Sequence, residues 1–157
     1  MITAVDTNIL LDLLIPGSSN VEEAQHQLDD ASEKGQVILS EVVLAELAAY
    51  FPNSHALEAF LVDTRLELLT GDQKVWVRAG QAWGMYAKRR KSVMVCAKCG
   101  RNQQVHCMQC QAPLRSRQHI VADFLIGAHA ELRADQLLTR DRGYYRTYFP
   151  NLSLVLS

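Results

Sequence analysis

Short apolar segments alternate with helical patterns along this chain of 157 residues. Between those segments, apolar residues recur every three or four positions, as they do on one face of an amphipathic helix. Strands that alternate with helices favour a parallel sheet covered by helices on both faces. The sequence therefore predicts a single three-layer α/β/α domain over 1–157 with a central, mainly parallel sheet. The predicted strands cover 2–5, 37–39, 66–69, 136–139 and 152–156.

Local signals predict where several helices begin. Asn20, with Glu23 three positions later, has the spacing of a capping box. Ser40 is a second candidate cap, at the start of a helix that Pro52 would stop. The segment 70–73, Thr-Gly-Asp-Gln, also has the spacing of a capping box and is expected to open a long helix.

The composition is that of an ordinary globular protein. Apolar residues make up 48% of the chain and charged residues 21%, and there are only eight Gly and four Pro residues. These values exclude collagen-like and disordered chains. The apolar run 9–11 is flanked by Asp6 and Asp12 and has no basic leader, so it is neither a signal peptide nor a membrane span. We expect a cytoplasmic protein that does not contact a membrane.

The charges are distributed unevenly, although the net charge is only −1. Residues 1–72 contain thirteen acids and two basic residues, whereas 73–122 contain ten basic residues and no acid. Such asymmetry is typical of chains that contact nucleic acid or another polyanion. A solvated helix face would explain the cluster 88–91 alone, but it explains a basic stretch of fifty residues less well.

Two acids follow predicted strands. Asp6 comes directly after the first strand, and Asp141 comes two residues after the strand that ends at Thr139. Ligands of parallel sheets gather at the carboxyl ends of the strands, near the point where the strand order reverses. Helix capping is an alternative role for both acids, since each precedes a possible helix.

Two further acids lie within helical segments that are otherwise apolar. Glu46 lies in the segment 42–48 and Asp123 in the segment 120–127. An ionised carboxylate among such neighbours must be paired or must bind a cation. A salt bridge to an arginine is the alternative to a ligand role. Gly127, one turn after Asp123, is expected to leave space on that face of the helix.

If the four acids converge, their mutual repulsion must be neutralised. Each pair of like charges at ~4 Å costs on the order of 4 kcal/mol at an effective dielectric constant near 20. Mg²⁺ or Mn²⁺ would neutralise this repulsion, because hard cations prefer carboxylate oxygens and leave coordination positions for water and phosphate. The chemistry that uses such a cluster is metal-dependent hydrolysis of phosphodiester bonds.

Four short motifs together resemble PIN-domain nucleases, and among them the VapC-type toxins of bacterial and archaeal toxin–antitoxin pairs. The motifs are Val5-Asp6-Thr7-Asn8, Ser40 followed six residues later by Glu46-Leu47, Asp123-Phe124-Leu125-Ile126-Gly127-Ala128-His129-Ala130, and Leu138-Thr139-Arg140-Asp141. The resemblance spans nearly the whole chain except the cysteine segment. It implies a Mg²⁺- or Mn²⁺-dependent endoribonuclease, usually a homodimer, inhibited by an antitoxin whose tail covers the active site. The implied metal-binding acids are Asp6, Glu46, Asp123 and Asp141, supported by Asn8 and Thr139.

The four cysteines form two Cys-x-x-Cys motifs within fifteen positions. They are Cys96, Cys99, Cys107 and Cys110. This spacing is typical of a structural tetrathiolate Zn²⁺ site, and a rubredoxin-like iron site or a redox-active thiol pair is the alternative. Gly100 follows the first motif and can adopt the positive φ that such turns often need, whereas Gln111 stands at the matching place in the second. The segment 92–117 is thus predicted to be a small zinc ribbon inserted into the domain.

The basic residues around the ribbon are candidate RNA contacts. They are Lys88, Arg89, Arg90, Lys91, Arg115 and Arg117. The alternative partner for the same surface is an acidic antitoxin tail. Aromatic residues of the long helix and of 144–148 could stack on bases, although the helical spacing of Trp76, Trp83 and Tyr86 is more typical of core. Two other functions stay open: a nuclease of ribosomal or transfer RNA maturation, and a non-catalytic RNA-binding module.

Overall fold

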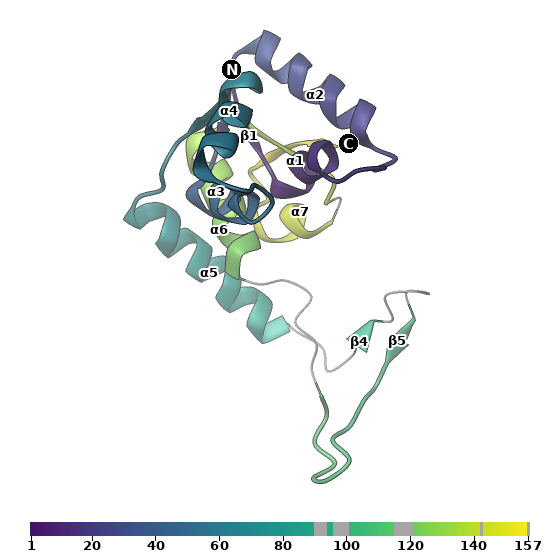
Figure 1. Cartoon of the computed structure of the whole chain (residues 1–157). Coiled ribbons are helices and arrows are strands. Elements are labelled where there is room, and N and C mark those ends of the chain that lie inside the picture. The colour runs from purple at the N-terminus through teal and green to yellow at the C-terminus, as the bar shows by residue number, and fades with distance from the viewer. Residues whose placement is uncertain (90–93, 96–100, 115–120, 142, 157) are drawn as a thin grey trace.

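The computed structural model describes residues 1–89, 94–95, 101–114, 121–141 and 143–156 (Figure 1). The strands are β1 (Ile2–Val5), β2 (Gln36–Leu39), β3 (Leu66–Leu68), β4 (Met94–Val95), β5 (Asn102–Gln103), β6 (Gln136–Thr139) and β7 (Ser153–Leu156). The helices are α1 (Thr7–Leu14), α2 (Val21–Lys34), α3 (Glu41–Ala48), α4 (Ser54–Asp63), α5 (Gln73–Arg89), α6 (Val121–Arg133) and α7 (Tyr144–Tyr148). None of the helices in these ranges is long and apolar enough to cross a bilayer.

The main sheet has five strands in the order β3-β2-β1-β6-β7. All of its neighbouring strands are parallel, and Ala4 in β1 lies opposite both Ile38 in β2 and Leu137 in β6. The predicted α/β/α architecture with a central parallel sheet is therefore confirmed. The strand order reverses between β1 and β6, so the carboxyl ends of these two strands form the crevice where parallel sheets bind ligands.

The core is built on the buried faces of the sheet and on an aromatic cluster beside it. Phe124 of α6 packs edge-on against Trp83 of α5 and Tyr144 of α7, with ring centroids 5.3 and 5.0 Å apart. The tyrosines of α7, Tyr144, Tyr145 and Tyr148, are all buried. Their burial argues against the alternative that these tyrosines stack on bases, because their rings pack between α5, α6 and α7.

Two helix caps differ from the prediction, although α2 begins directly after Asn20 as predicted. The side chain of Asn20 does not cap α2, so the capping box expected at that position is wrong. At α5 the cap is Asp72, whose Oδ1 accepts hydrogen bonds from the main-chain N–H groups of Lys74 at 2.9 Å and Val75 at 3.2 Å. Thr70, the first residue of the expected box, lies outside this arrangement. Ser40 caps α3 as predicted, because its Oγ accepts from the N–H of Val43.

The strands β4 and β5 belong to the cysteine segment and not to the main sheet. They form a separate antiparallel pair, with Met94 opposite Gln103 and Val95 opposite Asn102. Farther along, His106 and Pro113 form an antiparallel bridge on the two sides of the second Cys-x-x-Cys motif. Figure 1 shows β4 and β5 away from the strands and helices of the main domain.

Candidate active site

Asp6 lies at the carboxyl end of β1 and is only 6% exposed. Its Oδ2 accepts hydrogen bonds from Asn8 Nδ2 at 2.7 Å, Thr139 Oγ1 at 2.6 Å and the Tyr145 hydroxyl at 3.3 Å. The Asp6 side chain makes no capping hydrogen bond to α1. Capping is therefore not the role of this carboxylate, and its orientation is fixed by contacts from α1, β6 and α7.

The environment of Asp6 favours its protonated form. Burial raises its pKa from 3.8 to about 6, and the negative charge of Asp123 adds to the increase. The hydrogen bonds from Thr139 and Tyr145 stabilise the carboxylate and oppose this shift. A bound cation would offset the cost of ionising Asp6, because it places a positive charge next to the buried carboxylate.

Asp141 contacts the start of α7 through its side chain and Thr139 through its main chain. Its Oδ1 accepts hydrogen bonds from the N–H groups of Gly143 at 3.0 Å and Tyr144 at 2.8 Å, at the start of α7. Asp141 is thus not the N-cap residue of α7, which is Gly143, but one of its oxygens satisfies two main-chain N–H groups at the start of that helix. The main-chain N–H of Asp141 donates to Thr139 Oγ1 at 3.0 Å, and the same hydroxyl donates to Asp6. Thr139 therefore joins the two acids that follow β1 and β6.

Glu46 and Asp123 reach this edge of the sheet from two helices. The carboxylate of Glu46 accepts a hydrogen bond from the Thr7 hydroxyl, next to Asp6 in the chain. Asp123 lies in the first turn of α6, not in its interior, and its charge raises the pKa of both Asp6 and Tyr145. Among the described residues, however, no three Asp, Glu, His or Cys side chains are close enough to hold a metal ion.

Two contributors to this site are not evident in the sequence. Thr7 lies in the first of the four motifs, but nothing in its type distinguishes a partner of Glu46 from an ordinary helix residue. Tyr145 is buried against Asp6, and its pKa is raised well above the usual value by that burial. Its position in an aromatic run indicated core packing or base stacking, and only the tertiary structure shows its contact with Asp6.

The second Cys-x-x-Cys motif forms a tight turn. The N–H of Gln111 donates to the carbonyl of Cys107 at 2.9 Å, and Gln111 has a φ of 59°. Gln111 thus adopts the positive φ that was expected of glycine at this place. Main-chain groups of Cys110 and Gln109 lower the pKa of the Cys107 thiol. Cys96 and Cys99 lie outside the described residues.

Only part of the predicted RNA-binding surface falls within the described residues. Lys88 and Arg89 end α5, and both are exposed. Four more candidates lie outside the described residues: Arg90, Lys91, Arg115 and Arg117. The basic surface as a whole therefore stays a prediction.

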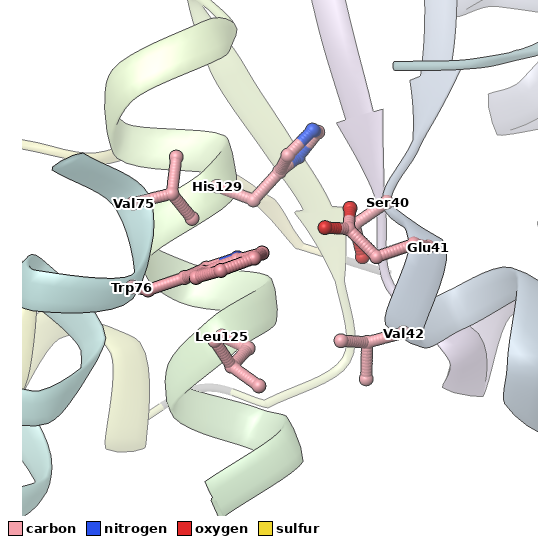
Figure 2. A pocket seen from close by; sticks show the side chains of 7 residues that line it. All are labelled: Ser40, Glu41, Val42, Val75, Trp76, Leu125 and His129. Carbon is pink, nitrogen blue, oxygen red and sulfur yellow. The ribbon is translucent and has the colours of Figure 1, made fainter. Parts of the chain in front are cut away.

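An apolar cavity of about 340 Å³ lies between α3, α5 and α6 (Figure 2). Trp76 stands on its wall and is 59% exposed, so the expectation that Trp76 belongs to the core is wrong. The carboxylate of Glu41 accepts from the N–H of Gly71, and His129 Nε2 lies 2.6 Å from the carbonyl oxygen of Leu69. These two polar side chains thus hold the loop that joins β3 to α5.

Comparison with known proteins identifies the family. The chain resembles that of VapBC2 from Rickettsia felis bound to a promoter DNA fragment, with 20% identity, 99% and 98% of the two chains covered and a TM-score of 0.61. It also resembles the chain of VapBC-1 from nontypeable Haemophilus influenzae, with 17% identity, 99% and 98% of the two chains covered and a TM-score of 0.63. A third similar chain is VapC20 from Mycobacterium tuberculosis, a sarcin-ricin loop cleaving toxin, with 16% identity, 96% and 98% of the two chains covered and a TM-score of 0.54. No curated protein matches the sequence. The PIN domain model matches residues 3–150, and the chain therefore belongs to the PIN domain family.

Proposed function

We propose that this protein is a metal-dependent endoribonuclease that hydrolyses RNA phosphodiester bonds. The observation that carries the proposal is the buried carboxylate of Asp6, which lies where the strand order reverses. The negative charge of Asp123 helps to raise the pKa of this carboxylate. The donors at this edge of the sheet are carboxylate oxygens, which fit a hard divalent cation. Asp6, Glu46, Asp123 and Asp141 would hold Mg²⁺ or Mn²⁺ there.

The chain's own groups orient these acids. Asn8, Thr139 and Tyr145 hold one oxygen of Asp6, and Thr7 holds the carboxylate of Glu46. When bound, the metal would supply a bound water of lowered pKa and a positive charge for the departing oxygen. The acids must move closer together than they lie here, and a divalent cation would favour that movement by neutralising their mutual repulsion.

Cleavage of total RNA tests this proposal directly. The purified protein is expected to give discrete products in Mn²⁺, and these products should vanish with EDTA and in the Asp6→Asn, Asp123→Asn double variant. Sequencing the product ends would identify the cleaved sites. A folded wild-type protein that cleaves no RNA in Mn²⁺ would favour a non-catalytic RNA-binding module instead.

We further propose that the nuclease is the toxin of a toxin–antitoxin pair and acts as a homodimer. The fold likeness to chains from VapBC complexes supports this role. Expression of the wild-type protein should then slow growth, and co-expression of a short neighbouring reading frame should relieve the effect and yield a complex. Light scattering should give a mass about twice 17.6 kDa. Growth that is unaffected by expression would favour a role in ribosomal or transfer RNA maturation.

The segment 92–117 is proposed to hold one structural Zn²⁺ through Cys96, Cys99, Cys107 and Cys110. Support comes from the tight turn at Cys107, in which main-chain groups lower the thiol pKa, because zinc binds the thiolate. The pairing of β4 with β5 supports it too, because these two strands flank the first Cys-x-x-Cys motif. The charge and fold of the ribbon would then depend on the metal.

Metal analysis of the full chain tests the zinc site. One zinc per chain is expected in the wild type, and the Cys107→Ser, Cys110→Ser double variant should lose it. Met108→Ala is the matched control, because Met108 lies on the same turn, is 94% exposed and offers no thiolate. This control should keep its zinc. Iron in place of zinc, or a disulfide in a metal-free wild type, would contradict the proposal.

RNA binding by the cluster 88–91 should be visible in its salt dependence. Each phosphate that is neutralised on a single strand adds about −0.7 to the slope of log K against log salt concentration. Replacing Lys88, Arg89, Arg90 and Lys91 by alanine should weaken binding and flatten the slope by roughly that amount for each phosphate that is no longer neutralised. Anisotropy titrations in EDTA measure the slope, with Lys74→Ala at the other end of α5 as control. An unchanged slope would exclude the cluster as an RNA-binding surface.

A further inference from the structure

A second buried carboxylate of α1, Asp12, forms an ion pair with Arg140. Asp12 is only 5% exposed, and its Oδ2 lies 2.6 Å from a terminal guanidinium nitrogen of Arg140. Its Oδ1 accepts a hydrogen bond from the Ser18 hydroxyl at 2.7 Å. A carboxylate at this depth is costly unless it is paired and hydrogen-bonded. Asp12 therefore fixes where the Arg140 side chain lies.

Arg140 in turn holds Asn8 at two points. The guanidinium nitrogen that faces Asp12 also donates to the main-chain oxygen of Asn8 at 2.7 Å. The main-chain N–H of Arg140 donates to Asn8 Oδ1 at 3.2 Å. Because the oxygen of the Asn8 amide is held in this way, its nitrogen faces Asp6 Oδ2 at 2.7 Å and Thr139 Oγ1 at 3.3 Å.

We propose that Asp12 and Arg140 are positioning residues that orient the Asp6 carboxylate through the amide of Asn8. This inference rests on the proposed function, in which Asp6 binds the catalytic metal. Arg140 lies between Thr139 and Asp141, where an arginine would otherwise suit a substrate phosphate. Its guanidinium instead forms an ion pair with Asp12 and donates a hydrogen bond to the Asn8 carbonyl. Loss of a partner behind a metal ligand typically costs 10–100-fold in metal affinity or activity.

Two substitutions test the positioning role. Asp12→Asn removes the charge that holds the guanidinium, and Arg140→Lys keeps a positive charge but cannot contact both Asp12 and the Asn8 carbonyl in the same way. Each variant is expected to bind Mn²⁺ at least about 10-fold more weakly than wild type and to lower kcat, with little change in KM for RNA. Mn²⁺ titration and single-turnover cleavage measure these effects.

The ion pair between Arg78 and Glu131 provides a matched control. Its N–O distance is also 2.6 Å, and its side chains are 21% and 9% exposed, against 29% and 7% for Arg140 and Asp12. Arg78→Lys and Glu131→Gln should therefore lower Tm by a similar amount. Because this pair joins α5 to α6 and does not contact Asn8, these variants should keep wild-type Mn²⁺ affinity. Equal losses of Mn²⁺ affinity in the two sets would overturn the proposal.

A measurement on the metal-free protein separates this inference from the proposed function. The side-chain amide protons of Asn8 should give shifted, slowly exchanging NMR signals in wild type and in Glu131→Gln. These signals should move toward free-amide positions in Asp12→Asn and Arg140→Lys. If wild type neither binds Mn²⁺ nor cleaves RNA, the proposed function fails, and the amide signals still decide the positioning role. Unchanged Asn8 signals, or a raised KM with unchanged Mn²⁺ affinity in Arg140→Lys, would overturn it.

Discussion

The Asp6→Asn variant is expected to lose RNA cleavage by about 100-fold or more and yet to be more stable than wild type in EDTA at neutral pH. The loss of activity follows from removing a carboxylate that the proposed metal requires. The gain in stability follows from burial, because the folded protein disfavours the ionised form of Asp6. In the proposed function, the same carboxylate would contribute to activity and oppose stability, as is common at functional sites.

The sign and size of the stability effect follow from the raised pKa of Asp6. Between pH 3.8 and about pH 6, the folded state binds more protons at Asp6 than the unfolded state does. The contribution of Asp6 to stability therefore falls as pH rises through this window and stays low above it. A difference of roughly two pKa units corresponds to about 3 kcal/mol at pH 7. Asn at this position stays neutral, so most of this pH dependence should disappear in the variant.

Urea unfolding in EDTA at pH 5 and pH 7.5 measures this effect in wild type and variant. Asp63→Asn, which changes an exposed acid at the end of α4, is the control. Its free energy of unfolding should change between pH 5 and pH 7.5 by the same amount as that of wild type. Added Mn²⁺ should stabilise wild type at pH 7.5 much more than Asp6→Asn. An Asp6→Asn protein that is less stable than wild type at pH 7.5 would show that its hydrogen bonds to Thr139 and Tyr145 outweigh the cost of burying the charge.

The main sheet could be predicted almost to the residue, whereas the short helices α1 and α7 could not. β1 and β6 lie at 2–5 and 136–139, as expected, because a buried parallel strand is a continuous apolar run between polar residues. α7 has only five residues, too few to show a helical period, and α1 contains the continuous apolar run 9–11, which shows no such period either. Tertiary contacts stabilise both helices. The long helix α5 was recognisable from its period, with the buried residues Val75, Ala79, Ala82 and Tyr86 on one face.

In the candidate site, too, the sequence predicts some features, and tertiary packing decides the others. The placement of Asp6 and Asp141 at the carboxyl ends of strands could be predicted, because strand ends are visible in the sequence. The sequence does not show that β1 and β6 are neighbours, because that depends on the strand order of the folded sheet. Which oxygen of Asp141 accepts hydrogen bonds from the start of α7, and which hydroxyl contacts Asp6, depends on how α7 packs on the sheet. The hydroxyl contacts with Asp6 join residues more than 130 positions apart, as between Asp6 and Tyr145, and no local pattern encodes them.

Gly127 shows how a local expectation fails when tertiary packing decides. The sequence indicated that this glycine leaves space beside Asp123, but the space is filled by the ring of Phe149, which is fully buried. A Cβ on residue 127 would lie 2.3 Å from Cε2 and 2.7 Å from Cδ2 of that ring. The ring cannot move away easily, because the guanidinium of Arg78 lies 4.6 Å from its centroid on one face.

Gly127→Ala is therefore expected to destabilise the protein by about 3 kcal/mol, the upper part of the usual range for overpacking, and to lower Tm by roughly 6–12 °C. Alanine is the better helix former by about 1 kcal/mol, so helix propensity alone predicts the opposite sign. Gly80→Ala in α5 isolates that propensity, because nothing lies within 4 Å of the added methyl group, and it should raise stability by up to about 1 kcal/mol. Thermal and urea unfolding of both variants measure the difference. Equal stabilities would mean that Phe149 yields to the methyl group, and that α6 and the segment after α7 pack less tightly than their buried rings indicate.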